Sequence, residues 1–455
     1  MMTLQQATQV LNGRLVGKNL RFKSISSDSR KIGQGDLFIA LRGENFDGYS
    51  FVNQSAQSGA VAALVNVDSY HNHAMDCPLI LVDDTRLALG KLAAHWRKKF
   101  DIPVVAITGS NGKTTVKEML ASILRLVAGG ADGVLATKGN FNNDIGMPLT
   151  LLGLNKQHRF AVIEMGMNHF GEIDYLTRIA EPNVAVINNA SGAHLQGLGS
   201  VEAVAQAKGE IFNGLQHGGT AIINGDDEYA PLWRTLAGAE QLLEFGLSPQ
   251  ADVSGKWHPH EGGLQLEVST PLGAFDAGLK IPGEHNALNA LAATAAAIAM
   301  NISPEKIATG LESFSGVAGR LQRSVGKHGA VIIDDTYNAN PASLHAAIKV
   351  LAEAVGKHVL VLGDMGELGD DAAMLHAEIG DVAHRAGIEK LFALGDLSRN
   401  AVSKFGSGAL HFERIEDLQN ELDKELDNHT TVLVKGSRFM KMERVVQFCT
   451  AGGNS

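Results

Sequence analysis

The stretch that decides the fold is Val104-Val105-Ala106-Ile107-Thr108-Gly109-Ser110-Asn111-Gly112-Lys113-Thr114-Thr115. Its first four residues are apolar and mostly β-branched, which predicts a buried strand. A glycine-rich turn follows, and residues 116–124 then place apolar side chains at helical spacing. A strand, a glycine-rich turn and a helix in this order predict a phosphate-binding loop inside an α/β domain.

The turn can bind phosphate because consecutive backbone N–H groups and the helix dipole point to the same place. Lys113 would reach the terminal phosphates of a nucleotide, and the Thr114 hydroxyl would ligate Mg²⁺. The commoner form of this loop has a glycine where Ile107 stands here, and Gly109 instead supplies the early turn. The alternative is a strand–helix turn of small residues, which needs neither a lysine nor paired threonines. We therefore expect nucleotide binding by Gly109, Ser110, Asn111, Gly112, Lys113, Thr114 and Thr115.

The length, composition and charge of the chain limit the classes of protein to which it can belong. A chain of 455 residues has room for about three domains, and its content of 45% hydrophobic and 19% charged residues is ordinary for soluble protein. The formal charge of −10 argues against a general nucleic-acid or anionic-membrane surface. With two cysteines, no signal-peptide pattern and no long apolar run, we expect a cytoplasmic chain without disulfides or membrane insertion. We also expect a monomer.

Residues 1–82 predict a small N-terminal α/β domain. Its strand-like runs are residues 36–41, 60–65 and 78–82. Two polar loops between them offer hydroxyl, guanidinium and glycine groups that suit a diphosphate or a sugar. These loops contain Ser27, Asp28, Ser29 and Arg30, and then Arg42 and Gly43. Taken alone, such residues favour ordinary polar surface turns.

Residues 83–316 predict a central ATP-binding domain whose parallel strands end on polar residues. Glu164 follows the strand of residues 160–163, and His194 follows the strand of residues 184–187. Side chains at the carboxyl ends of parallel strands face the ligand crevice, where Mg²⁺ needs oxygen donors. A lone histidine is usually structural or solvated, but His194 is expected in the same layer as Glu164.

Two further segments of this domain have a recognisable sequence pattern. Residues 140–143 hold three asparagines, including Asn142 and Asn143, which can close turns or hydrogen-bond a polar ligand. Residues 250–280 alternate apolar and polar side chains, which predicts an antiparallel flap.

The start of an Ala-rich helix near residue 284 is unusually polar. It carries His285, Asn286 and Asn289, which are poor choices for a helix interior. Both amides can pair with a purine edge, whereas helix capping would account for Asn286 alone.

Residues 317–455 predict a C-terminal Rossmann-like domain in which strands and helices alternate again. Its strand-like runs are residues 330–333, 358–362, 390–394 and 431–434. The loops after these strands should share the ligand-facing edge of a doubly wound sheet. A domain boundary is expected near residues 313–319, and residues 316–319 within it predict a hinge, so that a bound nucleotide would close this domain onto the central one.

Together these residues resemble the Mur ligases, ATP-dependent enzymes that form amide bonds in bacterial peptidoglycan precursor synthesis. The resemblance covers essentially the whole chain and follows the family's three-domain order. Its marks are the phosphate loop, Glu164 and the motifs SDSR (27–30), GNFNN (139–143), DDTYNANP (334–341) and GDMGELG (363–369). The asparagine-rich segment and the last two motifs resemble the member that adds D-alanyl-D-alanine to UDP-N-acetylmuramoyl-tripeptide. The implied reaction passes through an acyl phosphate that the dipeptide amine attacks.

The resemblance implies roles around the phosphates. Lys113 would hold the β- and γ-phosphates, Thr114 and Glu164 would hold one Mg²⁺, and the family places His194 at a second. Lys208 matches a position that is carbamylated in the family, and a carbamate would turn an ammonium into an anionic metal ligand. An ordinary lysine on a solvated helix face is the alternative for Lys208.

It also implies contacts with the rest of the substrates. The nucleotide would contact His285, Asn286 and Asn289, and then Arg320 and Asp335 from the third domain. The uridine diphosphate would lie on Ser27, Asp28, Ser29, Arg30, Arg42 and Gly43. The peptide substrates would contact Asn142, Asn143, Tyr337, Asn340, Lys435 and Arg438.

Two other classes stay open from the sequence. One is a sister ligase, such as the enzyme that adds the third amino acid or a folylpolyglutamate synthase. It would keep the ATP site and differ in the first and third domains. The other is a nucleotide-dependent switch without chemistry. Phosphate release that depends on a carboxylate substrate separates an enzyme from a switch.

Overall fold

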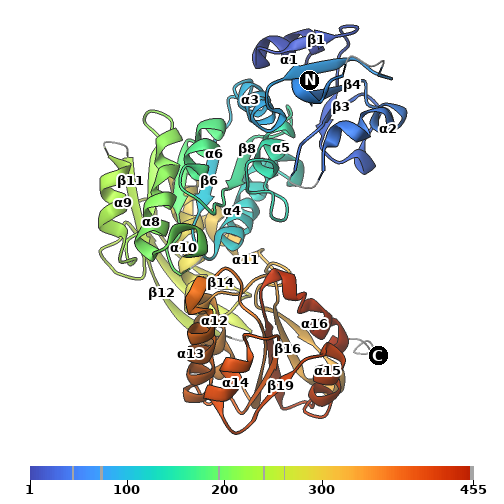
Figure 1. Cartoon of the computed structure of the whole chain (residues 1–455). Coiled ribbons are helices and arrows are strands. Elements are labelled where there is room, and N and C mark those ends of the chain that lie inside the picture. The colour runs from blue at the N-terminus through green and yellow to red at the C-terminus, as the bar shows by residue number, and fades with distance from the viewer. Residues whose placement is uncertain (44–45, 72–74, 193–194, 239–240, 261, 451–455) are drawn as a thin grey trace.

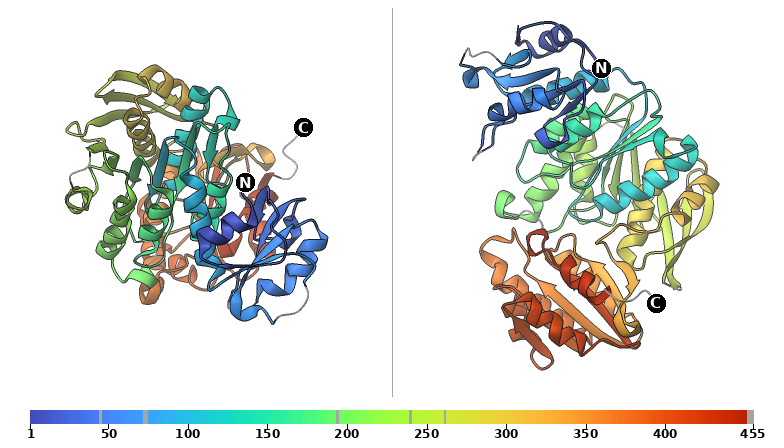
Figure 2. Two further views of the ribbon diagram at one scale, coloured as in Figure 1. Left: turned by 90° about the horizontal axis from the view of Figure 1, so that it is seen from above. Right: turned by 90° about the vertical axis from the view of Figure 1, so that its right-hand side faces the viewer.

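The chain folds around three β-sheets that form three lobes, as Figures 1 and 2 show. The computed structural model describes residues 1–43, 46–71, 75–192, 195–238, 241–260 and 262–450. Across these residues the sheets have five, nine and six strands, and the nine-stranded sheet lies between the other two. This confirms the three-domain α/β fold class. The domain limits at residues 82 and 316 stay a prediction.

The first sheet is mostly parallel and is buried on its three central strands. Its spatial order is β1 (Arg14–Val16), β5 (Leu79–Val82), β4 (Ala62–Asn66), β3 (Asp36–Ile39) and β2 (Ser24–Ser26), with β1 antiparallel to β5. Its helices are α1 (Leu4–Leu11) and α2 (Val52–Gln57). The three expected strands are present. The sequence missed β1 and β2 because each has three residues and no buried position.

The central sheet carries the phosphate loop. Its order is β14 (Gly273–Leu279), β13 (Gly263–Thr270), β12 (Val253–His260), β11 (Gln241–Gly246), β10 (Thr220–Asn224), β9 (Val184–Ile187), β6 (Val104–Thr108), β8 (Phe160–Glu164) and β7 (Val134–Ala136). The strands from β7 to β12 are parallel. The expected antiparallel strands of residues 250–280 are present, but they do not form a separate flap. Parallel pairing of β12 with β11 makes them an extension of this sheet.

Helices cover both faces of the central sheet. Alternate side chains of β6 enter two different hydrophobic clusters, with Val104 and Ala106 on one face and Val105 and Ile107 on the other. The helices of this region are α3 (Thr85–Arg97), α4 (Lys113–Ala128), α5 (Gly146–Leu152), α6 (Glu172–Ala180), α7 (Leu195–Leu198), α8 (Val201–Gly209), α9 (Ala230–Ala237), α10 (Glu284–Ala299) and α11 (Pro304–Glu312).

The third sheet has the order β15 (Gln322–Val325), β16 (Val331–Asp335), β20 (Thr430–Lys435), β17 (Lys357–Gly363), β18 (Lys390–Leu394) and β19 (Ala409–Phe412). The helices α12 (Pro341–Ala352), α13 (Ala372–Arg385) and α14 (Arg399–Phe405) bury one cluster, and α15 (Ile415–Asp423) and α16 (Glu443–Thr450) bury another. The sequence missed β15, an edge strand antiparallel to β16, because all of its residues are exposed.

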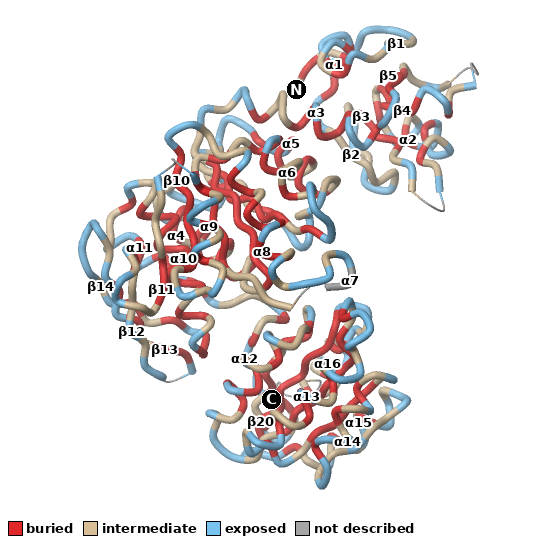
Figure 3. Tube along the Cα trace, turned by 60° about the vertical axis from the view of Figure 1, so that its left-hand side comes forward, coloured by how far each residue is buried: buried red, intermediate tan, exposed pale blue. Residues whose placement is uncertain are grey.

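Short 3-10 turns complete the description: η1 (Ser29–Lys31), η2 (Gly48–Phe51), η3 (Val67–Ser69), η4 (Ala131–Gly133), η5 (Glu210–Gly214), η6 (Lys327–Gly329), η7 (Gly369–Asp371) and η8 (Arg438–Met440). Figure 3 shows the buried residues gathered on the strands inside each lobe. Within the described residues, no helix is long and apolar enough to cross a membrane.

Candidate active site

The phosphate loop joins β6 to α4, as the sequence predicts. The Ser110 N–H donates to the Asn189 carbonyl oxygen at 3.0 Å, and the Asn111 N–H donates to Asn189 Oδ1 at 2.8 Å. Gly112 has a φ of +79°, and a Cβ there would lie 2.2 Å from Asn289 Oδ1. The loop therefore needs glycine at this position, and the polar end of the neighbouring strand β9 fixes its shape.

Lys113 is folded back onto this loop. Its Nζ donates to the Gly109 carbonyl oxygen at 2.6 Å and approaches that of Ser110 at 3.4 Å. Burial lowers the pKa of Lys113, the charge of Glu164 opposes this, and Arg320 lowers it further. The ammonium thus lies on carbonyl groups that a phosphate oxygen could replace.

Thr114 and Glu164 form a pair of oxygen donors at the carboxyl edge of the sheet. Thr114 Oγ1 donates to Glu164 Oε2 at 3.0 Å, and Glu164 Oε1 accepts from Asn142 Nδ2 at 2.8 Å. Among the described residues, no cluster of three or more His, Cys, Asp or Glu side chains could hold a metal. Mg²⁺ usually takes one or two protein oxygens and completes its shell with water and phosphate, so this pair fits Mg²⁺.

Two side chains of the third domain reach the phosphate loop. Arg320 Nη2 donates to Thr114 Oγ1 at 3.0 Å, and Asn340 Nδ2 donates to Asn111 Oδ1 at 2.9 Å. The Arg320 guanidinium also lies 4.2 Å from the centre of the Tyr337 ring. These contacts hold Arg320 beside Thr114, where we expect the nucleotide and Mg²⁺ to bind.

Asp335 and Lys435 form a buried ion pair between the adjacent strands β16 and β20. Lys435 Nζ donates to Asp335 Oδ2 at 2.5 Å and to the Asn338 carbonyl oxygen at 2.9 Å. Asp335 Oδ1 accepts from the Leu321 N–H at 3.2 Å. Burial raises the pKa of Asp335, and the charge of Lys435 opposes this shift. The two charged groups are therefore paired with each other inside the protein.

The asparagines at the start of α10 already have protein partners. Asn286 Nδ2 donates to the Pro282 carbonyl oxygen at 2.7 Å, and Asn289 Oδ1 accepts from Asn188 Nδ2 at 2.9 Å. Asn188 in turn donates to the Asn111 carbonyl oxygen, so α10 braces the phosphate loop. Burial lowers the pKa of His285 to about 4, which keeps its ring neutral. Adenine recognition by these three residues stays a prediction.

Most of the candidate residues share one cavity of about 930 Å³ between the central and third sheets. The candidates among its lining residues are Ser110, Asn111, Gly112, Lys113, Thr115, Asn142, Asn143, Glu164, His285, Asn286, Asn289, Arg320, Asp335, Tyr337, Asn340, Lys435 and Arg438. Gly109 and Thr114 lie beside this lining, as their bonds to Lys113 and Arg320 show.

The asparagine-rich segment closes a turn, as one interpretation predicts, and its binding of a polar ligand stays a prediction. Asn143 Oδ1 accepts from the Gly146 N–H at 2.8 Å and so closes the turn before α5. Asn142 instead bonds the carboxylate of Glu164. Of the two, Asn142 is the one with a direct connection to the metal candidates.

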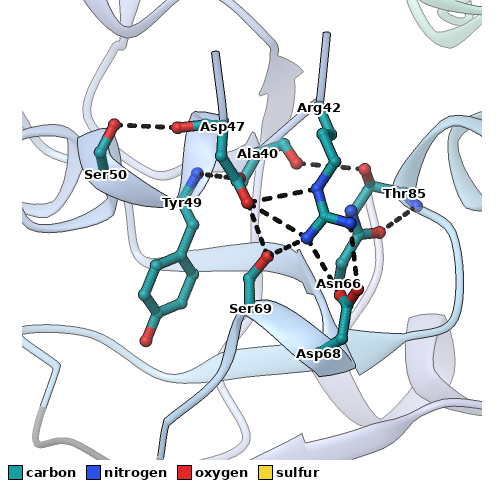
Figure 4. A network of polar contacts seen from close by, with 9 residues as sticks. All are labelled: Ala40, Arg42, Asp47, Tyr49, Ser50, Asn66, Asp68, Ser69 and Thr85. Atoms are coloured by element: carbon teal, nitrogen blue, oxygen red, sulfur yellow. Dashed lines mark hydrogen bonds and ion pairs between the residues drawn. The ribbon is translucent and has the colours of Figure 1, made fainter. Parts of the chain in front are cut away.

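The candidate residues of the first domain do not join this cavity. Figure 4 shows Arg42 hydrogen-bonded to Asp47, Asp68 and Ser69. Its Nη1 donates to Asp68 Oδ2 at 3.0 Å, and its Nη2 donates to Ser69 Oγ at 2.6 Å. Gly43 lies in the same loop, where its N–H donates to the Phe46 carbonyl oxygen. The Arg42 guanidinium is thus satisfied within the protein.

The loop of Ser27 and Ser29 has a similar internal pair. Arg30 Nε donates to Asp28 Oδ1 at 2.9 Å, and Arg30 Nη2 donates to Asp28 Oδ2 at 3.0 Å. Hydrogen bonds from Arg30 hold the pKa of Asp28 at about 2. A diphosphate bound here would have to replace Asp28 as the partner of Arg30.

Lys208 lies in α8 and is 2% exposed, so it is not on a solvated helix face. Burial, with a further contribution from the charge of Lys113, lowers its pKa well below the usual value of 10.5. Within the described part of the chain no carboxylate pairs with it. His194 lies outside the described residues.

The sequence analysis missed the residues that shape the phosphate loop from β9. Asn188, Asn189 and Ser191 all bond the loop, with Ser191 Oγ accepting from Asn111 Nδ2 at 2.9 Å. A signal was present, because all three follow a parallel strand at the same sheet edge as Glu164.

Comparison with known proteins gives a consistent result along the chain. The family description "Mur ligase middle domain" matches residues 107–297, "Mur ligase, glutamate ligase domain" matches residues 319–438, and "Mur ligase family, catalytic domain" matches residues 21–97. The UDP-N-acetylmuramoyl-tripeptide–D-alanyl-D-alanine ligase of Escherichia coli strain K12 is 41% identical over 459 residues, covering 99% of each chain.

Solved structures agree with this comparison. MurF from Acinetobacter baumannii superimposes with a TM-score of 0.91 and 37% identity, covering 98% of each chain. MurF from Thermotoga maritima, solved in complex with ADP, gives a TM-score of 0.83 at 28% identity, covering 94% of this chain and 96% of that one.

Proposed function

This chain belongs to the Mur ligase family, and we propose that it joins D-alanyl-D-alanine to UDP-N-acetylmuramoyl-tripeptide at the expense of ATP. The observation that carries this proposal is the single cavity in which the phosphate loop meets the polar loops of the third sheet. Such a cavity can bring a nucleotide, a carboxylate and an amine together. The relatives that match the full length are ligases of this reaction.

The reaction needs charge neutralisation more than covalent chemistry from the protein. ATP transfers its γ-phosphoryl group to the terminal carboxylate of the tripeptide, and the dipeptide amine then attacks the acyl phosphate and releases phosphate. Lys113 and Arg320 are the cations at the phosphate loop that would offset the phosphate charge. Both would exchange their present oxygen partners for phosphate oxygens.

We propose Thr114 and Glu164 as the residues that would hold Mg²⁺. When bound, the ion supplies further charge neutralisation at the phosphates. Asn142 would orient the Glu164 carboxylate through its other oxygen.

We assign the dipeptide to the polar edge of the third sheet. Arg438 lines the cavity, its side chain is 63% exposed, and its partner Glu443 lies outside the cavity lining. Lys435 is instead buried against Asp335. Arg438 is therefore the better candidate for the dipeptide carboxylate, and Lys435 has a structural role.

The uridine diphosphate would lie on the first domain, at the loops of Arg30 and Arg42. Both guanidinium groups are now paired with carboxylates. Binding would therefore need an exchange of partners, which a dianionic diphosphate can drive.

The test is an ATPase and ligation assay on the purified chain. ATP, UDP-N-acetylmuramoyl-tripeptide and a panel of amines are combined, and phosphate release and the amide product are both measured. We expect both signals with D-alanyl-D-alanine only. Ligation of a free amino acid would identify a sister ligase, and ATP hydrolysis that ignores the carboxylate would identify a switch.

A further inference from the structure

The loop of residues 363–369 is fixed by two side chains that bind consecutive backbone amides. The Met365 N–H donates to His376 Nε2 at 2.9 Å, and the Gly366 N–H donates to Ser437 Oγ at 2.8 Å. Gly366 and the two residues after it line the cavity. A loop that would otherwise have free amides at this wall is thus held from α13 on one side and from the end of β20 on the other.

Ser437 joins three loops of the third sheet. Besides accepting from Gly366, its hydroxyl donates to the Ala339 carbonyl oxygen at 3.3 Å. Its backbone N–H donates to the Asp364 carbonyl oxygen at 2.9 Å. Ser437 is 4% exposed, and its single hydroxyl proton is used within the protein. It therefore connects the loops after β16, β17 and β20, which together form the wall that we assign to the dipeptide.

His376 is fully buried, and its two ring nitrogens have different partners. Nδ1 lies 2.6 Å from the Ala372 carbonyl oxygen, so this nitrogen carries the proton. Nε2 is then an acceptor, as the Met365 N–H requires. The ring can hold the loop in this way only in its neutral form.

Gly366 lies against the turn that follows Ser437. A Cβ at this position would lie 2.9 Å from the ring of Phe439 in η8, two residues after Ser437. The loop is therefore packed against the segment of residues 437–439 and hydrogen-bonded to it at the same point.

We propose that Ser437 and His376 are positioning residues for the amino substrate. They preset the wall formed by residues 363–369 so that the dipeptide meets it in one shape. The inference rests on the proposed function, because that function supplies the dipeptide. Neither residue needs to touch a reacting atom, and a preset wall lowers the ordering cost of binding.

The first test compares Ser437→Ala with Ser398→Ala in the full chain. Ser398 is a matched control, since it is a buried serine of the same domain whose hydroxyl bonds only the Gly395 carbonyl oxygen. We expect Ser437→Ala to raise the KM for D-alanyl-D-alanine about tenfold, the loss of roughly one hydrogen bond, and to leave the KM for ATP within about twofold. Ser398→Ala should leave both KM values unchanged.

A second pair of variants tests the other side of the loop. His376→Gln keeps an acceptor that can reach Met365, whereas His376→Asn is too short to do so. We expect the dipeptide KM to rise with Asn and to stay near the wild-type value with Gln. A role in stability alone would change the melting temperature without separating the two substrates.

Hydrogen exchange of residues 363–369 is measured on the same proteins. We expect faster exchange at the amides of Met365 and Gly366 in Ser437→Ala and His376→Asn than in the controls. An unchanged dipeptide KM in both variants, or equal changes for ATP and dipeptide, overturns the inference. If the wild type shows no ligation, the proposed function fails instead, and the exchange data still decide whether the two side chains hold the loop.

Discussion

Among single residues, two lysines of the central domain, Lys113 and Lys208, lie in different environments. Lys113 is partly exposed and rests on loop carbonyl groups that a nucleotide can displace. Lys208 is buried and has no carboxylate partner among the described residues. Burial without a carboxylate partner disfavours the charged form of Lys208, whereas the charge of Glu164 favours the charged form of Lys113.

Lys113→Ala should lower ligation on the order of 10²-fold or more, because the variant loses a cation that offsets charge on the transferring phosphoryl group. Turnover of purified enzyme measures this, with a thermal melt to show that the variant is folded. Lys256→Ala, which removes an exposed lysine of β12, is the control and should retain full activity. A folded Lys113→Ala enzyme with more than about a tenth of wild-type turnover would contradict the assignment.

Lys208 should carry a carbamate in the active enzyme. Burial lowers its pKa and so favours the neutral amine, which is the form that reacts with carbon dioxide. The carbamate would supply an anionic oxygen ligand at a position where an ammonium would repel Mg²⁺. We expect Lys208→Ala to lose most activity and to recover part of it with formate or acetate.

The control for this prediction is wild-type enzyme depleted of carbon dioxide, which bicarbonate should reactivate. Near-normal turnover of Lys208→Ala would end the carbamate interpretation. So would a structure of the active state that shows an unmodified lysine.

At the scale of elements, the third sheet divides its basic residues between stability and binding. Lys435 ends β20 in a buried pair with Asp335, whereas Arg438 in η8 extends into the cavity region. The ion pair also holds the Leu321 N–H, next to Arg320. The end of a strand and the turn that follows it therefore serve different purposes.

Arg438→Ala should raise the KM for D-alanyl-D-alanine with little effect on ATP, because the dipeptide carboxylate loses its cation. Lys435→Ala should instead destabilise the fold by about 3–5 kcal/mol, since it leaves a buried carboxylate unpaired. Kinetics and urea unfolding of both variants measure the two effects. Equal kinetic effects of the two variants, or ligation of free meso-diaminopimelate or L-lysine, would contradict this division.

Across the whole molecule, the third domain touches the phosphate loop. Arg320 and Asn340 make these contacts, with Thr114 and Asn111. The sequence predicts a hinge near residues 316–319 and closure upon nucleotide binding. Two hydrogen bonds of about 0.5–1.5 kcal/mol each can already shift the domain equilibrium several-fold toward contact.

Asn340→Asp should expand the ligand-free protein. The aspartate keeps the oxygen that caps α12 through the Ser343 N–H but loses the donor to Asn111. Small-angle scattering should show a larger radius of gyration, and an ATP analogue with the UDP-substrate should reverse the change. Arg323→Ala, on the exposed strand β15, is the control. An unchanged radius of gyration in Asn340→Asp would show that this contact does not hold the domain.

The parts of the fold and of the candidate site that depend on local chemistry could be predicted from the sequence alone. The order of apolar strand, glycine turn and helix located the phosphate loop, and Gly112 shows why, since its conformation and its neighbours exclude a side chain. Buried strands such as β6 were found from their own composition. The three-residue strand β2 and the exposed strand β15 were not, because each is defined by pairing with a neighbouring strand and not by its own residues.

Whether a polar group already has a partner depends mainly on contacts between distant segments of the chain. Arg42 and Lys435 have the charge that a substrate would need, and each is already paired with a carboxylate from a distant part of the chain. The pair of Arg30 with Asp28 is instead local, because the two residues are two positions apart. Asp335 and Lys435 are 100 residues apart in the sequence and adjacent in the sheet. A side chain's charge is set by its type, but its partner is set by which distant segments the fold brings within about 3 Å, and local sequence carries no record of that distance.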